Sequence, residues 1–72
     1  QRQMCIRDRA ESAALGHVGL SESQVAGLRS ERDYDDGRLE YEVEFRSGGM
    51  EYEYTIDGAS GAILEYEKDW DD

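Results

Sequence analysis

Two short segments in which apolar and charged residues alternate constrain this chain more than any other feature. Residues 39–46 read LEYEVEFR and residues 50–57 read MEYEYTID. A period of two places successive side chains on opposite faces of a β-strand, so each segment predicts a strand with one apolar face and one wet face. Gly48-Gly49 separates the segments and can adopt the positive φ angles of a two-residue type I′ turn. The sequence therefore predicts a β-hairpin.

The turn also fixes the register of this hairpin. If Ser47 lies opposite Met50, every apolar residue of one strand meets an apolar residue of the other on the same face. Arg46 then meets Glu51 on the opposite face. The predicted apolar pairs are Phe45 with Tyr52, Val43 with Tyr54 and Tyr41 with Ile56.

Asp36-Gly37 is a second hairpin turn, and it predicts an earlier strand that starts after Val25. Its register pairs Asp35 with Arg38, Tyr34 with Leu39, Ser30 with Val43 and Leu28 with Phe45. Arg32 would then lie opposite Tyr41 on the buried face, where its stem can cover the ring while its charged head stays in water.

A third turn over residues 57–61 suits a type I turn closed by a glycine bulge. The strand after it is expected to bring Leu64 and Tyr66 inward. We expect residues 67–72, EKDWDD, to fray.

A helix is expected before the strands, because apolar residues and His17 recur at three- and four-residue spacing from Ala10 to Val18. Asp8 with Glu11 can form a capping box at its start, and Gly19-Leu20 predicts a left-handed C-cap after His17 or Val18. Ser21 and Gln24 can then cap one short turn.

These elements predict an α+β fold in which one N-terminal helix packs on a four-stranded antiparallel β-meander. Seventy-two residues suffice for one domain with a small core. We assign residues 10–68 to this domain. Residues 1–9, QRQMCIRDR, fit no element and are interpreted as a disordered tail or an assembly remnant, and residues 69–72 as an acidic tail.

The formal net charge is -10, and residues 30–72 carry fifteen acids against four bases. Such a field repels phosphate groups, so we expect no nucleic-acid partner and no anionic lipid surface. No apolar run approaches the length of a membrane span and no signal peptide is present in the piece given, so membrane insertion is not expected. Basic proteins, cations or solvent remain.

Catalytic and metal-binding chemistry finds little support. The single cysteine, Cys5, cannot close an internal disulfide, and with His17 alone it cannot complete a zinc site. Asp33, Asp35 and Asp36 are similar to the start of a calcium loop, but an EF-hand needs glycine at its sixth position, where Arg38 stands. We expect no catalytic residue, cofactor or metal.

The outward face of the predicted sheet is strongly acidic. Like charges opposite one another cost stability, so this face either binds a basic partner or cations, or is simply solvated. By contrast, the five tyrosines alternate with these charged residues and point to the opposite, inner face, so we expect them to be core residues. The candidate partner-binding residues are Glu40, Glu42, Glu44, Glu51 and Glu53, with further acids at Glu31, Asp33, Asp57, Glu65 and Glu67.

Over residues 10–68 the order of these motifs resembles the bacterial PepSY domain. The resemblance is carried by Ala10, Ala14-Leu15, His17, Gly19, Asp35-Asp36-Gly37, Tyr41-Glu42-Val43-Glu44-Phe45, Gly48-Gly49, Tyr52-Glu53-Tyr54, Ile56-Asp57 and Gly61-Ala62-Ile63-Leu64. Ser30 and Arg32 depart from it, because apolar residues are common at these two positions in the family.

The resemblance implies a non-catalytic module of extracytoplasmic proteins, secreted or at the cell surface, that binds and restrains a peptidase. Repeats of the same domain can be its neighbours. The alternative hypothesis is an acidic structural or cation-binding spacer repeat of a secreted or surface protein.

Overall fold

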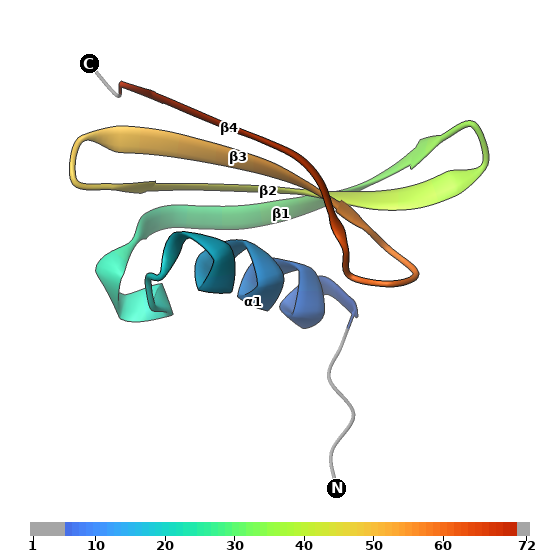
Figure 1. Ribbon diagram of the computed structural model, residues 1–72, viewed down its shortest axis with the longest axis horizontal. Helices are drawn as coiled ribbons and strands as arrows, with labels where there is room; N and C mark the ends of the chain where they lie inside the picture. Colours follow the sequence, from blue (N-terminus) through green and yellow to red (C-terminus); the bar gives the residue numbers. More distant parts are fainter. Residues whose placement is uncertain (1–5, 71–72) are drawn as a thin grey trace, which may run out of the picture.

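The computed structural model describes residues 6–70. A helix, α1 (Ile6–Val18), and a single 3₁₀ turn, η1 (Glu22–Gln24), precede four strands. The strands form one antiparallel sheet in sequence order, and α1 lies across one of its faces (Figure 1). This architecture confirms the predicted α+β fold. The strands are β1 (Ala26–Asp35), β2 (Arg38–Ser47), β3 (Met50–Asp57) and β4 (Ile63–Trp70).

The β2–β3 hairpin has the predicted register throughout, and the β1–β2 hairpin has it from Ser30 to Asp35. Gly48 and Gly49 both have positive φ, 59° and 79°, as a type I′ turn requires, and Asp36 and Gly37 do the same at 57° and 78°. In the β2–β3 hairpin, the confirmed pairs are Tyr41 with Ile56, Val43 with Tyr54, Phe45 with Tyr52 and Arg46 with Glu51. In the β1–β2 hairpin they are Ser30 with Val43, Arg32 with Tyr41, Tyr34 with Leu39 and Asp35 with Arg38.

A bulge that the sequence analysis did not predict interrupts the start of β1. Ala26 pairs with Arg46 and Arg29 with Glu44, so two residues of β1 stand where β2 has one. These two residues are Gly27 and Leu28, which both stand opposite Phe45, so the expected one-to-one pair of Leu28 with Phe45 is not formed. Gly27 has a φ of 66°, a conformation that other residues rarely adopt.

Strand β4 corrects two expectations. Ile56 pairs with Ile63 and Thr55 with Glu65, so Leu64 is an inserted residue. The bulge turns Leu64 away from the core, and its side chain is 40% exposed. Ile63 packs against the core instead. The strand also continues to Trp70, which pairs with Met50, so residues 67–70 do not fray.

The helix begins earlier than predicted and ends as predicted. Residues 6–9 form its first turn, so Asp8 lies inside the helix and does not cap it. Its carboxylate still stabilises the helix, because a negative charge in the first turn interacts favourably with the positive end of the helix dipole. At the other end Gly19 has a φ of 79°, and the amides of Gly19 and Leu20 both donate to the Leu15 carbonyl, at 2.9 and 3.0 Å. Cys5 lies outside the described residues, and the interpretation of residues 1–9 as a remnant stays a prediction.

The short turn after the helix also follows the prediction. The amide of Ser21 donates to Oε1 of Gln24 at 2.8 Å, which is one half of a capping box. Ser47 Oγ in turn donates to the Gln24 carbonyl at 3.0 Å and ties η1 to the end of β2.

The core lies between α1 and the two central strands. Alanines on α1 allow a close approach of helix and sheet, and a helix of 13 residues is about 20 Å long, too short to cover the whole sheet. No residue of β1 or β4 is fully buried. The buried apolar side chains are Ala10, Ala14 and Leu15 of α1, Tyr41, Val43 and Phe45 of β2, and Tyr54 and Ile56 of β3.

The five tyrosines therefore divide, although all were expected to be core residues. Tyr41 and Tyr54 are buried and Tyr52 is half-buried, whereas Tyr34 is 66% and Tyr66 53% exposed. The expectation was wrong for Tyr34 and Tyr66, because α1 packs on β2, β3 and part of β1 and leaves the remaining inner surface open.

Candidate functional site

Among residues 6–70, no other element lies on the face of the sheet opposite α1 (Figure 1). Cross-strand pairing aligns its charged side chains in rows that run over all four strands. One row joins Arg29 of β1, Glu44 of β2, Glu53 of β3 and Glu67 of β4. The neighbouring row joins Glu31, Glu42, Thr55 and Glu65. We call this surface the acidic face.

The five candidate residues named from the sequence all lie on this face. Glu40, Glu42 and Glu44 come from β2, and Glu51 and Glu53 from β3. The hairpin brings them together, because alternate residues of paired strands share one face. Sequence reasoning missed Leu64, which joins the margin of this face through the β4 bulge and lines a hollow with Glu40 and Glu65.

Glu53 stands at the centre of the acidic face, and its surroundings oppose ionisation. Desolvation raises its pKa above the ordinary glutamate value, and the neighbouring charges raise it further. Glu44 and Glu67, which flank it on β2 and β4, make the largest of these charge contributions. A cationic group placed over Glu53 would therefore relieve a repulsion that the fold imposes.

Basic residues lie at both ends of the acidic face, Arg38 beside Asp35 and Glu40 at one end and Arg29 with Arg46 at the other. Arg29 forms an ion pair with Glu44, with Nη2 and Oε1 3.2 Å apart. The arginine side chain is 76% exposed, so the pair contributes well below about 1 kcal/mol. Arg46 lies opposite Glu51 in the next row.

Asp57, at the end of β3, has a structural role of its own. Its carboxylate accepts hydrogen bonds from Ser60 Oγ at 2.8 Å and from the Ala59 amide at 3.2 Å. These bonds lower the pKa of Asp57. The carboxylate thus holds the β3–β4 turn.

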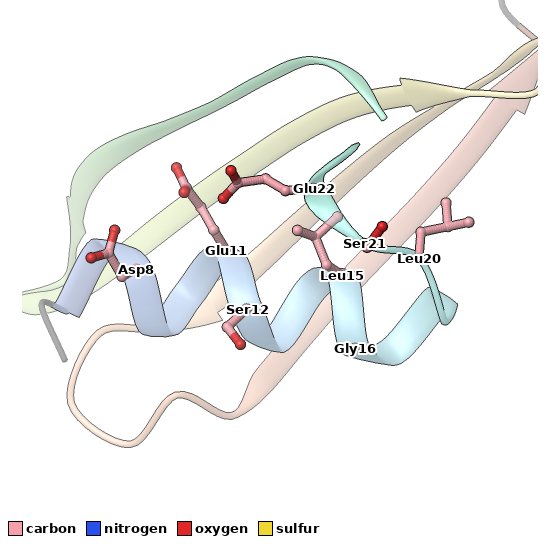
Figure 2. Close-up of a pocket in the computed structure, with 8 residues that line it drawn as sticks. All are labelled: Asp8, Glu11, Ser12, Leu15, Gly16, Leu20, Ser21 and Glu22. Atoms are coloured by element: carbon pink, nitrogen blue, oxygen red, sulfur yellow. The ribbon is translucent and has the colours of Figure 1, made fainter. Parts of the chain in front are cut away.

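A groove of about 440 Å³ lies between α1 and η1 (Figure 2). Leu15 and Leu20 give it apolar walls, and the side chains of Glu11 and Glu22 extend into it. Ser30 Oγ donates to Glu11 Oε2 at 2.7 Å, so this carboxylate joins α1 to β1.

His17 lies at the edge of the covered region. Its Nδ1 is 2.8 Å from the hydroxyl of the buried Tyr54, and its ring packs against Tyr66 with the centroids 4.7 Å apart. The contact satisfies the one polar atom of Tyr54, so His17 acts as a packing residue there.

In the described part of the chain, no group of three or more histidine, cysteine, aspartate or glutamate side chains could hold a metal ion. Within residues 6–70, no helix combines the length and apolar character needed to cross a membrane.

A single helix over an antiparallel meander, with charged groups on the opposite sheet face, defines a small two-layer α+β module. A family model described as "Peptidase propeptide and YPEB domain" matches residues 7–67. The chain belongs to this family, PepSY, as its motifs predicted. The family is that of a peptidase propeptide module.

A curated protein of Streptococcus pyogenes serotype M6, named "Uncharacterized protein Spy1430", is 41% identical over 58 residues. The match covers 81% of this chain and 45% of that protein, so the chain spans less than half the length of this relative. No solved structure matches.

Proposed function

We propose that this chain is a non-catalytic module that binds and restrains a peptidase in the extracytoplasmic space, and that the acidic face is its contact surface. Membership of the PepSY family supports a partner related to peptidases. The proposed contact residues are Glu40, Glu42, Glu44, Glu51 and Glu53.

The observation that carries the choice of surface is the row in which Glu44, Glu53 and Glu67 stand side by side on three strands. Like charges directly opposite one another destabilise a sheet, so the isolated domain is less stable than a neutral-faced one. A basic patch on a partner would recover this free energy on binding. The raised pKa of Glu53 supports the same interpretation.

The test is capture of proteins from the extracytoplasmic fraction of the source organism on the immobilised domain, with peptidase activity measured in its presence and absence. We expect stoichiometric capture of a peptidase and loss of its activity. The variant Glu42→Gln/Glu44→Gln/Glu53→Gln should weaken capture at least about tenfold, because charge-paired contacts are lost on all three positions.

A matched control removes the same number of charges from the side of α1, as Asp8→Asn/Glu11→Gln/Glu22→Gln, and should capture as the parent does. Equal loss with both triple variants would mean that net charge, rather than the acidic face, attracts the partner. Calcium titration by calorimetry tests the spacer hypothesis, since calcium heat without any captured protein would favour it.

A further inference from the structure

Strand β4 is the open edge of the sheet beside β3, and no strand pairs with its outer side within residues 6–70. Its inner face carries Tyr66, Lys68 and Trp70, which pair with Tyr54, Tyr52 and Met50. α1 covers little of it, and Tyr66 is 53% and Trp70 76% exposed. An edge strand presents unpaired backbone donors and acceptors, so β4 offers both hydrogen bonds and aromatic surface to an added strand.

The opposite edge, β1, is less suited to receive a strand. The bulge at Gly27 bends its start, and bulges are a common means of blocking edge pairing. Arg29 and Arg32 break up its surface, and Tyr34 near its end is its single large exposed aromatic residue. β4 has its own bulge at Leu64, and the stretch after it, from Glu65 to Trp70, pairs regularly and carries the two exposed aromatic residues Tyr66 and Trp70.

The charged side chains of β4 indicate what kind of strand could bind at this edge. Its outward side chains are Glu65, Glu67 and Asp69, and Lys68 is the one basic residue of the strand. A second copy of this chain would place acids opposite acids, whether β4 pairs with β4 or with the Glu31 and Asp33 of β1. Such pairs are destabilising, so the charges disfavour self-association and favour a basic strand.

We propose that the outer edge of β4 binds an extended segment of another protein by β-strand addition, and that this segment has basic residues at alternate positions with aromatic or β-branched residues between them. The basic side chains would face Glu65, Glu67 and Asp69. The intervening side chains would pack beside Tyr66 and Trp70. The proposal rests on the proposed protein-binding function, extends its contact surface from the acidic face to the outer edge of β4, and assigns the partner an extended conformation.

In strand addition, the backbone and the side chains of the edge strand contribute differently to binding. Main-chain hydrogen bonds along the edge supply affinity for any extended segment, and alternate side chains decide which segment is accepted. Trp and Tyr are enriched among residues that dominate binding energy, so the exposure of Trp70 at this edge fits a contact residue.

The probe is a synthetic peptide of about eight residues with arginine at every second position and valine or tyrosine between. Trp70 is the single tryptophan of the chain, so its fluorescence reports directly on this edge. We expect saturable binding with a blue shift of the tryptophan emission. Titration of a labelled peptide should give a dissociation constant raised about tenfold by Trp70→Ala and about threefold by Tyr66→Ala.

Two controls separate strand addition from charge attraction. The same peptide with N-methyl groups on the residues of one edge keeps its charge but loses backbone donors, and it should bind at least about tenfold more weakly. Glu65→Gln/Glu67→Gln should weaken binding, whereas the β1-edge variant Tyr34→Ala should leave it unchanged.

Binding that is indifferent to N-methylation, or equal losses with β1 and β4 variants, would overturn the proposal, as would the absence of binding. Circular dichroism of each variant checks that the fold is kept. Peptidase capture that persists without any binding of the peptide would refute strand addition and leave the proposed function standing.

Discussion

Strands β3 and β4 are neighbours with similar alternating sequences, yet they end in opposite environments. Tyr54 and Ile56 of β3 are buried under α1, at 2% and 0% exposure. Tyr66 of β4 pairs with Tyr54 and stacks on it, with ring centroids 5.4 Å apart, but is half-exposed. Alternation in sequence therefore specifies which face a side chain occupies, and the reach of the helix decides whether that face becomes core.

This difference makes the two strands respond differently to the same change. The central strands β2 and β3 supply the buried side chains that stabilise the domain, whereas most side chains of β4 are exposed. Substitutions at matched positions of the central and edge strands test this difference.

Val43→Asp should unfold the domain. Val43 is completely buried among apolar residues, and an unpaired charge there would cost several kcal/mol, about the whole stability expected of a chain this short. The measurement is the loss of the circular dichroism signal and of cooperative melting. The matched variant Tyr66→Asp, on the inner face of β4, should fold with a melting temperature within a few degrees of the parent. If Val43→Asp and Tyr66→Asp were equally stable, the proposed difference between the central strands and β4 would be wrong.

Gly58→Ala and Gly16→Ala should change stability in opposite directions. A Cβ at Gly58 would lie 2.6 Å from Leu39 Cγ and 2.9 Å from the Leu39 carbonyl oxygen, which also accepts the Gly58 amide hydrogen bond. We expect Gly58→Ala to cost about 1–3 kcal/mol.

Gly16 lies within α1 and a Cβ there meets nothing within 4 Å. Gly16→Ala should therefore stabilise the domain by up to about 1 kcal/mol, because glycine loses more backbone entropy in a helix. Urea unfolding of both variants provides the comparison. Stabilisation by Gly58→Ala would show that the β3–β4 turn is not packed against β2.

Tyr54→Phe tests the boundary between the covered and open regions. The substitution removes the hydrogen bond with His17 Nδ1 and should lower the free energy of unfolding by about 0.5–1.5 kcal/mol. Tyr34→Phe, on the exposed end of β1, provides the control and should have no measurable effect. Equal values for the two variants would place the His17 contact outside the stabilising core.

Glu53→Gln should raise the melting temperature at neutral pH by about 1–4 °C, since it removes one member of an opposed glutamate pair. The folded state raises the pKa of Glu53, so ionisation of this group opposes folding above that pKa, and the penalty disappears as the pH falls through it. The gain of the variant should therefore shrink as the pH falls from neutral through the raised pKa of Glu53. Asp57, whose pKa is lowered, has the opposite sign: its stabilisation is present at neutral pH and is lost as the pH falls through the lowered pKa.

The sequence predicted the parts of this fold that depend on local rules. Turn glycines and period-two alternation sufficed for the β2–β3 register, and Gly19 for the end of the helix. The same alternation placed Glu42, Glu44 and Glu53 on one face. Their use as a binding surface follows from no local rule and stays a prediction.

The features that sequence reasoning missed depend on contacts between distant elements. The bulges at Gly27 and Leu64 change the register by one residue, which a hydrophobic pattern alone does not reveal. Tyr66 has the inward phase of a core residue, and only the length and position of α1 leave it open.

The contact of α1 with the β3–β4 turn has a consequence for the order of folding. Arg9 Nη2 donates to the Ser60 carbonyl at 3.0 Å, across 51 positions of sequence, and the His17–Tyr54 bond spans 37. The β2–β3 hairpin closes over a two-residue loop, whereas these contacts close most of the chain at a larger entropic cost. During synthesis the helix leaves the ribosome first and has no sheet to dock on until β3 has emerged. We therefore expect the β2–β3 hairpin to nucleate the domain and α1 to dock last, so φ-values should be high around Gly48 and low in α1.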